Sequence, residues 1–221
     1  MAERAFAPDT AELRVQWGHF AWDEARAKAA ADILTRYPAG RQASASIPFL
    51  DLAQRQVGEM TGTQGWLPIP VIEFVARELD MPPVRVMEVA SFYTMFNLAP
   101  VGKFHVQVCG TTPCMLRGSD DVLSACYKRG LKKGHTTADG MFTLTEVECL
   151  GACANAPMVQ INDDNYEDLT FDSMSAILDD LAAGRRPKIG PQIERQTSCP
   201  EGGPTVLKEM VTENHDYRGE W

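Results

Sequence analysis

Apolar and charged positions alternate with a helical period through the N-terminal half of the chain. Between about Phe20 and Tyr37, apolar residues recur every three or four positions, which predicts an amphipathic helix that stops at Pro38 and Gly40. A second helix is predicted from about Ser44 to Val57, with Pro48 in its first turn, where a missing N–H costs little. Residues 1–18 show no sustained period, so they predict an extended or partly ordered arm.

Two segments that begin with prolines complete a predicted four-helix region. Pro68 and Pro70 precede VIEFVARELD, and the pair at 82–83 precedes VRVMEVASFYTMF; each segment predicts a helix of about three or four turns. The last helix ends in a dense group of aromatic and methionine side chains: Phe92, Tyr93, Met95 and Phe96. Their helical spacing favours burial in a core over a cofactor pocket or a partner surface.

The pattern changes to strand-like alternation after Pro100. The predicted strands, in chain order, are Lys103–Val108, Met141–Thr145, Pro157–Asn162 and Tyr166–Leu169, the last two forming a hairpin. A helix capped by Ser119 or Asp120 is expected between the first two strands, and a closing helix capped by Asp172 ends at Gly184. This order fits a small thioredoxin-like α/β domain with both cysteine pairs in loops at strand ends.

After Gly184 the composition shifts to Pro, Gly, Arg and Gln without a hydrophobic period, and such a segment cannot form a core by itself. We therefore predict an α+β chain of two main parts, with an arm and a tail. The arm covers residues 1–18, the helical domain 19–98, the thioredoxin-like domain 99–186 and the extended C-terminal tail 187–221.

Composition and charge exclude several classes of protein. The 221 residues are 44% hydrophobic, enough for real cores, and 21 Lys and Arg stand against 30 Asp and Glu, for a net charge of −9. The acidic excess is spread evenly along the chain. This argues against binding to nucleic acid and against electrostatic binding to an anionic membrane surface. No apolar run approaches the roughly 20 residues of a membrane span, and the start MAERAFAPDT is not a signal peptide, so we expect a bacterial cytoplasmic location.

Four of the six cysteines form two close pairs. Four residues separate Cys109 from Cys114, and three separate Cys149 from Cys153. A set of four thiolates selects zinc or an iron–sulfur cluster over hard cations. The four-residue gap recurs in [2Fe-2S] ferredoxins, whereas zinc knuckles often have two residues between ligands, so the spacing favours a [2Fe-2S] cluster and leaves zinc open.

Other uses of the cysteines fit the sequence less well. Two disulfides would need an oxidising compartment, and a thioredoxin-type redox pair has two residues between its cysteines. Cys126, four residues after Val122, is predicted on the core face of a helix, and Cys199 is predicted to be a free thiol. The histidines fall at no metal-binding spacing: His19, His105, His135 and His215. No GxGxxG, P-loop or HExxH motif occurs in the helical region.

Glycines and carboxylates beside the cysteines suggest how an anionic cluster would be held. Gly110 and Gly151 predict either close approach of backbone N–H groups to sulfur or ordinary turns. Glu146 and Glu148 would lower the reduction potential if they lay near the cluster, and would have no effect if they were solvated.

The chain resembles the thioredoxin-like [2Fe-2S] subunit of respiratory complex I, the NuoE family, from about Phe20 to Gln192. The resemblance lies in RQASASIPFLDLAQRQ, MPPVRVMEVASFYTMFN, VCGTTPCMLRGSD, VECLGACANAPMVQINDD and GPQ. Small ferredoxins and the diaphorase modules of NAD-linked hydrogenases and formate dehydrogenases share the cysteine pattern, and the helical region excludes a bare ferredoxin.

The resemblance implies an electron-transfer role in the NADH-oxidising module of NADH:quinone oxidoreductase. The cluster ligands would be Cys109, Cys114, Cys149 and Cys153. FMN and NADH would be held by the neighbouring flavoprotein subunit, with the large iron–sulfur subunit beside it, in the peripheral arm on the cytoplasmic side of the bacterial inner membrane. The alternatives are a hydrogenase or formate dehydrogenase diaphorase subunit and a zinc-stabilised docking subunit. No catalytic set occurs on this chain.

Overall fold

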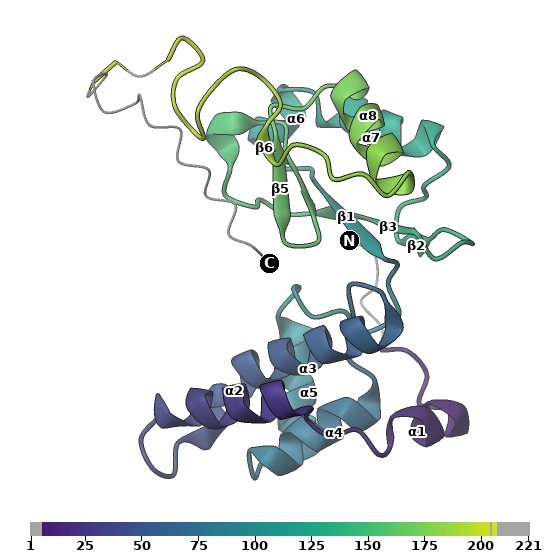
Figure 1. Cartoon of the computed structure of the whole chain (residues 1–221), viewed down its shortest axis with the longest axis vertical. Coiled ribbons are helices and arrows are strands. Elements are labelled where there is room, and N and C mark those ends of the chain that lie inside the picture. The colour runs from purple at the N-terminus through teal and green to yellow at the C-terminus, as the bar shows by residue number, and fades with distance from the viewer. Residues whose placement is uncertain (1–5, 204, 207–221) are drawn as a thin grey trace. The chain divides into compact units, whose positions relative to one another are not determined.

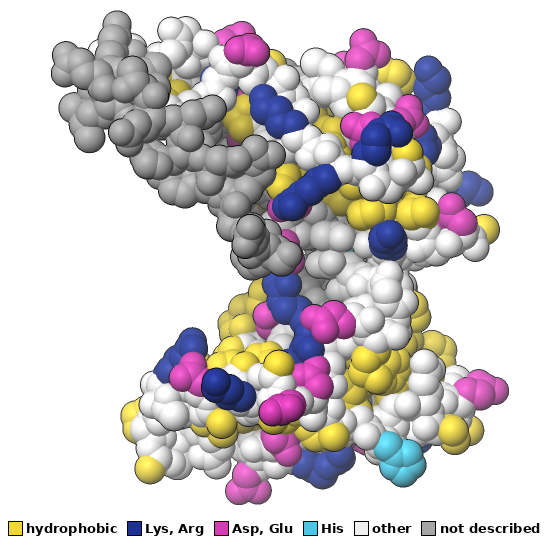
Figure 2. Space-filling model, in the orientation of Figure 1, with side chains coloured by type: hydrophobic (Ala, Val, Ile, Leu, Met, Phe, Trp, Pro, Cys, Tyr) yellow, Lys and Arg dark blue, Asp and Glu magenta, His cyan; other side chains and the backbone are white. Residues whose placement is uncertain are grey.

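The computed structural model describes residues 6–203 and 205–206, and these residues form two compact units (Figure 1). Unit 1 comprises the described chain up to His105 together with Gly134–Thr143. Unit 2 comprises Val106–Lys133 and the described chain from Leu144 onward. On the face drawn in Figure 2, acidic and basic side chains are interspersed, which agrees with the even spread of charge along the sequence.

Unit 1 contains the predicted helical region. Its helices are α1 (Ala11–Trp17), α2 (Glu24–Thr35), the 3₁₀ turn η1 (Gln42–Ala45), α3 (Ser46–Thr61), α4 (Ile69–Glu78) and α5 (Pro83–Phe92). Helices α2 to α5 lie where the hydrophobic period predicted them. Helix α1 lies where only an arm was predicted: Thr10 caps it by accepting the Leu13 N–H, and buried Trp17 anchors its end.

Helix α3 provides much of the core of unit 1. Phe49, Leu50, Ala53 and Val57 follow each other at helical spacing, and each is at most 1% exposed. The helix continues past its predicted end at Val57 and stops at Gly62, whose φ of 66° provides the left-handed C-terminal cap.

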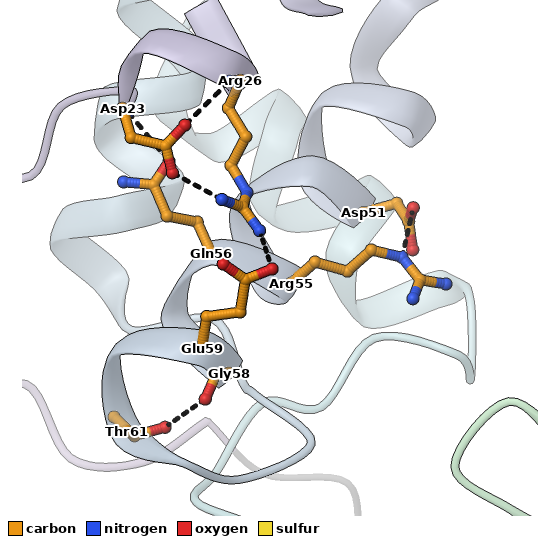
Figure 3. Close-up of polar contacts among 8 residues, drawn as sticks. All are labelled: Asp23, Arg26, Asp51, Arg55, Gln56, Gly58, Glu59 and Thr61. Atoms are coloured by element: carbon orange, nitrogen blue, oxygen red, sulfur yellow. Dashed lines mark hydrogen bonds and ion pairs between the residues drawn. The ribbon is translucent and has the colours of Figure 1, made fainter. Parts of the chain in front are cut away.

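A polar network fixes the start of α2 against α3 (Figure 3). Asp23 caps α2 by accepting the Arg26 N–H at 2.8 Å, and the Arg26 guanidinium then bridges Asp23 and Glu59 of α3. Gln56 of α3 accepts the Asp23 N–H at 3.3 Å and donates to the Ala21 carbonyl at 2.8 Å. The Gln56 side chain of α3 thus bonds to two backbone groups just before α2, and Arg26 of α2 binds Glu59 of α3, so the two helices are joined at this point.

Helix α5 ends four residues earlier than predicted, because a side chain from α3 holds the following segment in another conformation. Gln54 is 7% exposed; its amide nitrogen donates to the Met95 carbonyl at 3.2 Å, and its oxygen accepts the Asn97 N–H at 2.7 Å. These bonds give the Met95 carbonyl and the Asn97 N–H partners outside the helix.

The early end of α5 also places aromatic side chains on the surface. Phe96 is buried at 1% exposure, as predicted. The prediction of core burial was wrong for Phe92, Tyr93 and Met95, which are 78%, 40% and 51% exposed. Phe92, the last residue of α5, faces solvent from the helix itself. Beyond it the helical period is broken, so helical spacing no longer indicates which side chains face the core.

Six strands form a mixed sheet in the order β2-β3-β1-β4-β5-β6. Their bounds are β1 Phe104–Cys109, β2 His135–Thr136, β3 Phe142–Val147, β4 Val159–Ile161, β5 Asp164–Glu167 and β6 Gly190–Pro191. Strand β4 is antiparallel to β1, with Val108 opposite Val159, and β4 and β5 form the predicted hairpin. Strand β6 runs parallel to β5 and was not predicted, because only pairing with β5 defines its two residues.

The helices of unit 2 are α6 (Thr112–Leu116), α7 (Ser119–Lys128), the turn η2 (Cys153–Asn155) and α8 (Phe171–Ala182). Helices α7 and α8 pack against each other and were both predicted, but their caps were not. Gly118, at φ 103°, occupies the N-cap of α7 in place of Ser119 or Asp120. Thr170 caps α8 through a capping box with Ser173, so the prediction of Asp172 was also wrong.

The predicted tail is partly ordered against unit 2. The Gln192 N–H donates to the Glu167 carbonyl at 2.9 Å, directly after β6. The end of the predicted tail, from residue 207, lies outside the described residues. Within the described part of the chain, no helix combines the length and apolar character that crossing a membrane requires.

Candidate metal centre

Strands β1 and β3, neighbours in the sheet, direct the two cysteine pairs to one place. Cys109 is the last residue of β1, and the following Gly110 N–H donates to the carbonyl of Val147, the last residue of β3, at 3.1 Å. Both strands therefore end side by side, and Cys149 lies two residues after the end of β3. Cys153 begins η2. Cys109 belongs to β1 and Cys114 lies in α6, so the prediction that both pairs lie in loops was wrong for the first pair.

The four thiols interact with one another across both pairs. The sulfur atoms of Cys149 and Cys153 are 3.3 Å apart. Cys109 acts electrostatically on each of the other three thiols, and Cys153 acts on Cys114. No group of three or more His, Cys, Asp or Glu side chains among the described residues is arranged to hold a single ion. The arrangement is instead one of two adjacent thiol pairs.

Within each pair, one thiol has a lowered pKa and the other a raised pKa. Burial raises the pKa of Cys109, but hydrogen bonds from the Thr111 hydroxyl and from the backbone of Thr111 and Leu150 outweigh it, so the net pKa is lowered. Burial and the neighbouring Cys109 raise the pKa of Cys114 to about 11. A metal bound at the site would favour the thiolate of both members.

The exposed pair shows the same asymmetry. The backbone N–H of Gly151 and the Cys153 thiol lower the pKa of Cys149. The neighbouring Cys149 thiol and burial raise the pKa of Cys153. One sulfur in each pair is therefore already stabilised as an anion by hydrogen-bond donors, as a thiolate ligand requires.

The two glycines of this region have different roles. The Gly151 N–H donates to the Cys149 sulfur at 3.4 Å with the backbone at φ +87°, which confirms the interpretation that glycine allows an N–H to reach sulfur. That interpretation was wrong for Gly110, whose N–H donates to a carbonyl. A Cβ on Gly110 would lie 2.4 Å from a carboxylate oxygen of Glu146, so glycine there makes space for that side chain.

The two carboxylates beside the second pair are also placed differently from each other. Glu146 forms an ion pair with Lys133, which offsets its charge, so the structure does not support a strong effect of Glu146 on the reduction potential. Glu148 is exposed to solvent. Solvent screening weakens its effect on the potential as well.

The site is buried on one side and open on the other. Cys109 and Cys114 are 1% exposed and pack with Ala156 and Met158, whereas Cys149 and Cys153 are exposed. The four thiols, the N–H donors and the apolar wall together fit a cluster held by thiolates near the surface.

Among the described residues, Cys126, Cys199, His19, His105 and His135 do not join this group. Cys126 is 0% exposed in the core, as predicted, and Cys199 is a half-buried free thiol. Of the histidines, His215 lies outside the described residues, and burial lowers the pKa of His105 to about 4.

Comparison with known families decides which cofactor the thiol pairs suit. The sequence profile of the thioredoxin-like [2Fe-2S] ferredoxin family matches residues 30–182. The chain belongs to this family. The [2Fe-2S] cluster favoured by the cysteine spacing is thereby confirmed over zinc, and the fold is a thioredoxin-like ferredoxin fold with a helical N-terminal region.

Relatives of known name are also close in sequence. A subunit of NADH-quinone oxidoreductase from Rickettsia conorii is 57% identical over 164 residues, which are 74% of this chain and 95% of that protein. The protein of the same name from Rickettsia bellii is 56% identical over 164 residues, again 74% of this chain and 95% of the relative. The resemblance to the NuoE family that the motifs indicated is confirmed.

A solved structure supports the fold alone. The crystal structure of an NAD+-reducing [NiFe]-hydrogenase in the air-oxidised state superposes with a TM-score of 0.50 at 18% identity. The match covers 60% of this chain and 23% of the hydrogenase chain.

Proposed function

We propose that this chain is the NuoE-type electron-transfer subunit of NADH-quinone oxidoreductase and holds one [2Fe-2S] cluster. The observation that carries the proposal is the convergence of two cysteine pairs at the adjacent ends of β1 and β3, with N–H donors directed at sulfur. This chain aligns with 95% of the length of a relative named as a subunit of this complex, so the similarity is to that whole subunit and not to a part of it. When bound, the cluster takes up and releases one electron at a time.

Cys109, Cys114, Cys149 and Cys153 are the proposed cluster ligands. The buried pair would anchor the cluster against the apolar wall, and the exposed pair would bring its other side toward solvent. The Gly151 N–H and the Thr111 hydroxyl stabilise negative charge on two of the sulfurs. Electron exchange requires a cluster edge that a partner can approach, and the exposed pair provides one.

The proposed partners are the flavoprotein subunit that holds FMN and NADH and the large iron–sulfur subunit of the same module. Exposed apolar side chains beside the cluster, Met115 at 53% and Leu116 at 76%, suit a protein contact there. Residues 1–98 and the predicted tail after Gly184 would serve assembly, since their sequences contain apolar and aromatic residues but no catalytic set. The complex would place this subunit in the peripheral arm on the cytoplasmic side of the inner membrane.

A diaphorase subunit of an NAD-linked hydrogenase is the second candidate, and a structural likeness at 18% identity supports only its fold. Deletion of the gene separates the two candidates. Loss of NADH:quinone oxidoreduction in isolated membranes, with NAD-linked hydrogenase activity unchanged, supports the proposal. The reverse result would assign the chain to the hydrogenase.

Partner dependence of cluster reduction tests the role itself. We expect NADH to bleach the visible absorbance of the cluster only when the purified chain is mixed with the flavoprotein subunit. Cys126→Ala is the matched control, because this buried thiol lies in the core outside the proposed site. Reduction by NADH without the partner, or no reduction in the assembled module, contradicts the proposal.

A further inference from the structure

A buried ion pair joins the segment after α8 to the body of unit 2. The side chains of Asp168 and Arg195 are 5% and 10% exposed. The Arg195 Nε donates to Asp168 Oδ2 at 2.8 Å, and an Nη atom of the same guanidinium donates to Oδ1. This is the bidentate geometry in which an arginine fork matches a carboxylate.

The same guanidinium reaches two backbone carbonyls from separate segments. It donates to Ala154 O at 3.1 Å and to Cys199 O at 3.1 Å. Ala154 directly follows Cys153 and belongs to the turn η2 that Cys153 begins. One side chain therefore connects the turn that begins at Cys153, Asp168 just before α8, and the residues after β6.

A second side chain fastens the same loop. Asn155 is 2% exposed; its amide nitrogen donates to Thr197 O at 2.8 Å and to Asp168 Oδ2 at 3.4 Å. The Asn155 carbonyl accepts the Asp168 N–H at 2.8 Å, with the Asp168 backbone held at φ +54°. The turn that contains Cys153 is thus bonded to Asp168 and to residues 195–199 through both side chains and backbone.

We propose that Arg195 is a positioning residue for the [2Fe-2S] cluster, which fixes the turn of Cys153 by binding Ala154 O and Asp168 together. The proposal rests on the ligand role proposed for Cys153. Cys153 is exposed, so the packing that holds buried Cys109 and Cys114 does not restrain it in the same way. Hydrogen bonds from residues 195–199 supply the missing restraint.

Arginine is required here because its planar fork binds the carboxylate and still has a donor for each carbonyl. A lysine at 195 would keep the positive charge beside Asp168 but would lose the fork that spans Asp168 and Ala154. Arg195→Lys therefore separates positioning from simple charge compensation. Arg195→Met removes both the positive charge and the hydrogen-bonding fork.

The test measures how fast an iron chelator bleaches the cluster of the full-length chain, together with the EPR line shape of the reduced protein. Loss of a partner that orients a metal ligand typically costs about 10–100-fold in metal affinity, so we expect Arg195→Lys to lose its cluster at least about 10-fold faster. Arg185→Met is the control for loss of an exposed arginine ion pair, because the Arg185 Nε and an Nη atom both donate to one oxygen of Asp180 and the Arg185 side chain is 62% exposed. The control should stay within about twofold of the wild type.

The outcomes separate the two proposals. A changed line shape and faster cluster loss in Arg195→Lys, with urea unfolding close to the wild type, support positioning. Wild-type line shape and release rate in Arg195→Lys overturn it, as does an equal acceleration in Arg185→Met. Cys153→Ala tests the underlying ligand role: if this variant retains the wild-type cluster, the ligand assignment itself fails, whatever the Arg195 variants do.

Discussion

Gly151→Ala should change the electronic properties of the cluster more than it changes the fold. Gly151 has φ +87°, and a Cβ built on it would meet no atom within 4 Å, so the substitution adds backbone strain without a clash. A left-handed conformation costs an L-residue about 1–2 kcal/mol. Gly130, at φ +89° after α7, also has open space around a Cβ, which makes Gly130→Ala a control of equal strain.

The difference between the two variants lies in the bond from the Gly151 N–H to the Cys149 sulfur, at 3.4 Å. We expect the backbone of Gly151→Ala to shift away from the left-handed conformation, which draws this N–H away from sulfur. A hydrogen bond to a charged group contributes about 1.5–3 kcal/mol. The bond stabilises the more negative reduced cluster more than the oxidised one. Loss of a preference of about 1 kcal/mol therefore lowers a one-electron midpoint potential by about 40 mV.

Redox titration followed by EPR measures the potential, and urea unfolding measures the strain. We expect both variants to lose about 1–2 kcal/mol of unfolding free energy, whereas only Gly151→Ala shifts the midpoint downward. Equal midpoints in Gly151→Ala and Gly130→Ala, at equal loss of stability, would show that this N–H does not stabilise a cluster ligand.

Three further predictions concern Gln54, His105 and Cys126. Gln54→Leu leaves the Met95 carbonyl and the Asn97 N–H without their partner and should cost about 2–4 kcal/mol in urea unfolding; a loss below about 0.5 kcal/mol would contradict the role given to Gln54. Burial lowers the pKa of His105 to about 4 from 6.5, so the unfolded chain binds the proton first and stability should fall between pH 6.5 and 4, by at most about 1.4 kcal/mol per pH unit. His105→Gln should flatten that part of the stability curve, and an unchanged curve would refute the assignment. Burial raises the pKa of Cys126 to about 12, so iodoacetamide at about pH 9 should modify it in urea but not in the native protein, as peptide mass spectrometry would show.

Long periodic segments were predictable from the sequence, whereas features that depend on contacts between distant segments were not. Helices α2 to α5 have enough turns for the period to show, but α1, with seven residues, does not. The true end of α5 depends on Gln54, which lies in another helix. The caps of α7 and α8 were also predicted wrongly. Gly118 caps α7 without a side-chain hydrogen bond, and Thr170 caps α8 through a capping box with Ser173.

The candidate site likewise has one part that was predictable from the sequence and one part that was not. Cysteine spacing alone identified the two pairs, because metal ligation by close pairs is a local property of the sequence. The donors around them come from several segments, as the bond from Arg195 to Ala154 shows across 41 residues. The pairing of Glu146 with Lys133 spans 13 residues and offsets the electrostatic effect expected of that carboxylate. No short motif encodes such contacts.

EPR of the dithionite-reduced, full-length chain tests the central claim most directly, with each cysteine replaced in turn by alanine, which cannot bind iron. We predict a [2Fe-2S] signal of about one spin per chain in the wild type, in Cys126→Ala and in Cys199→Ala. The signal should vanish in the alanine variants of Cys109, Cys114, Cys149 and Cys153. A wild-type signal in any of those four variants, or its loss in Cys199→Ala, would contradict the proposed ligand set.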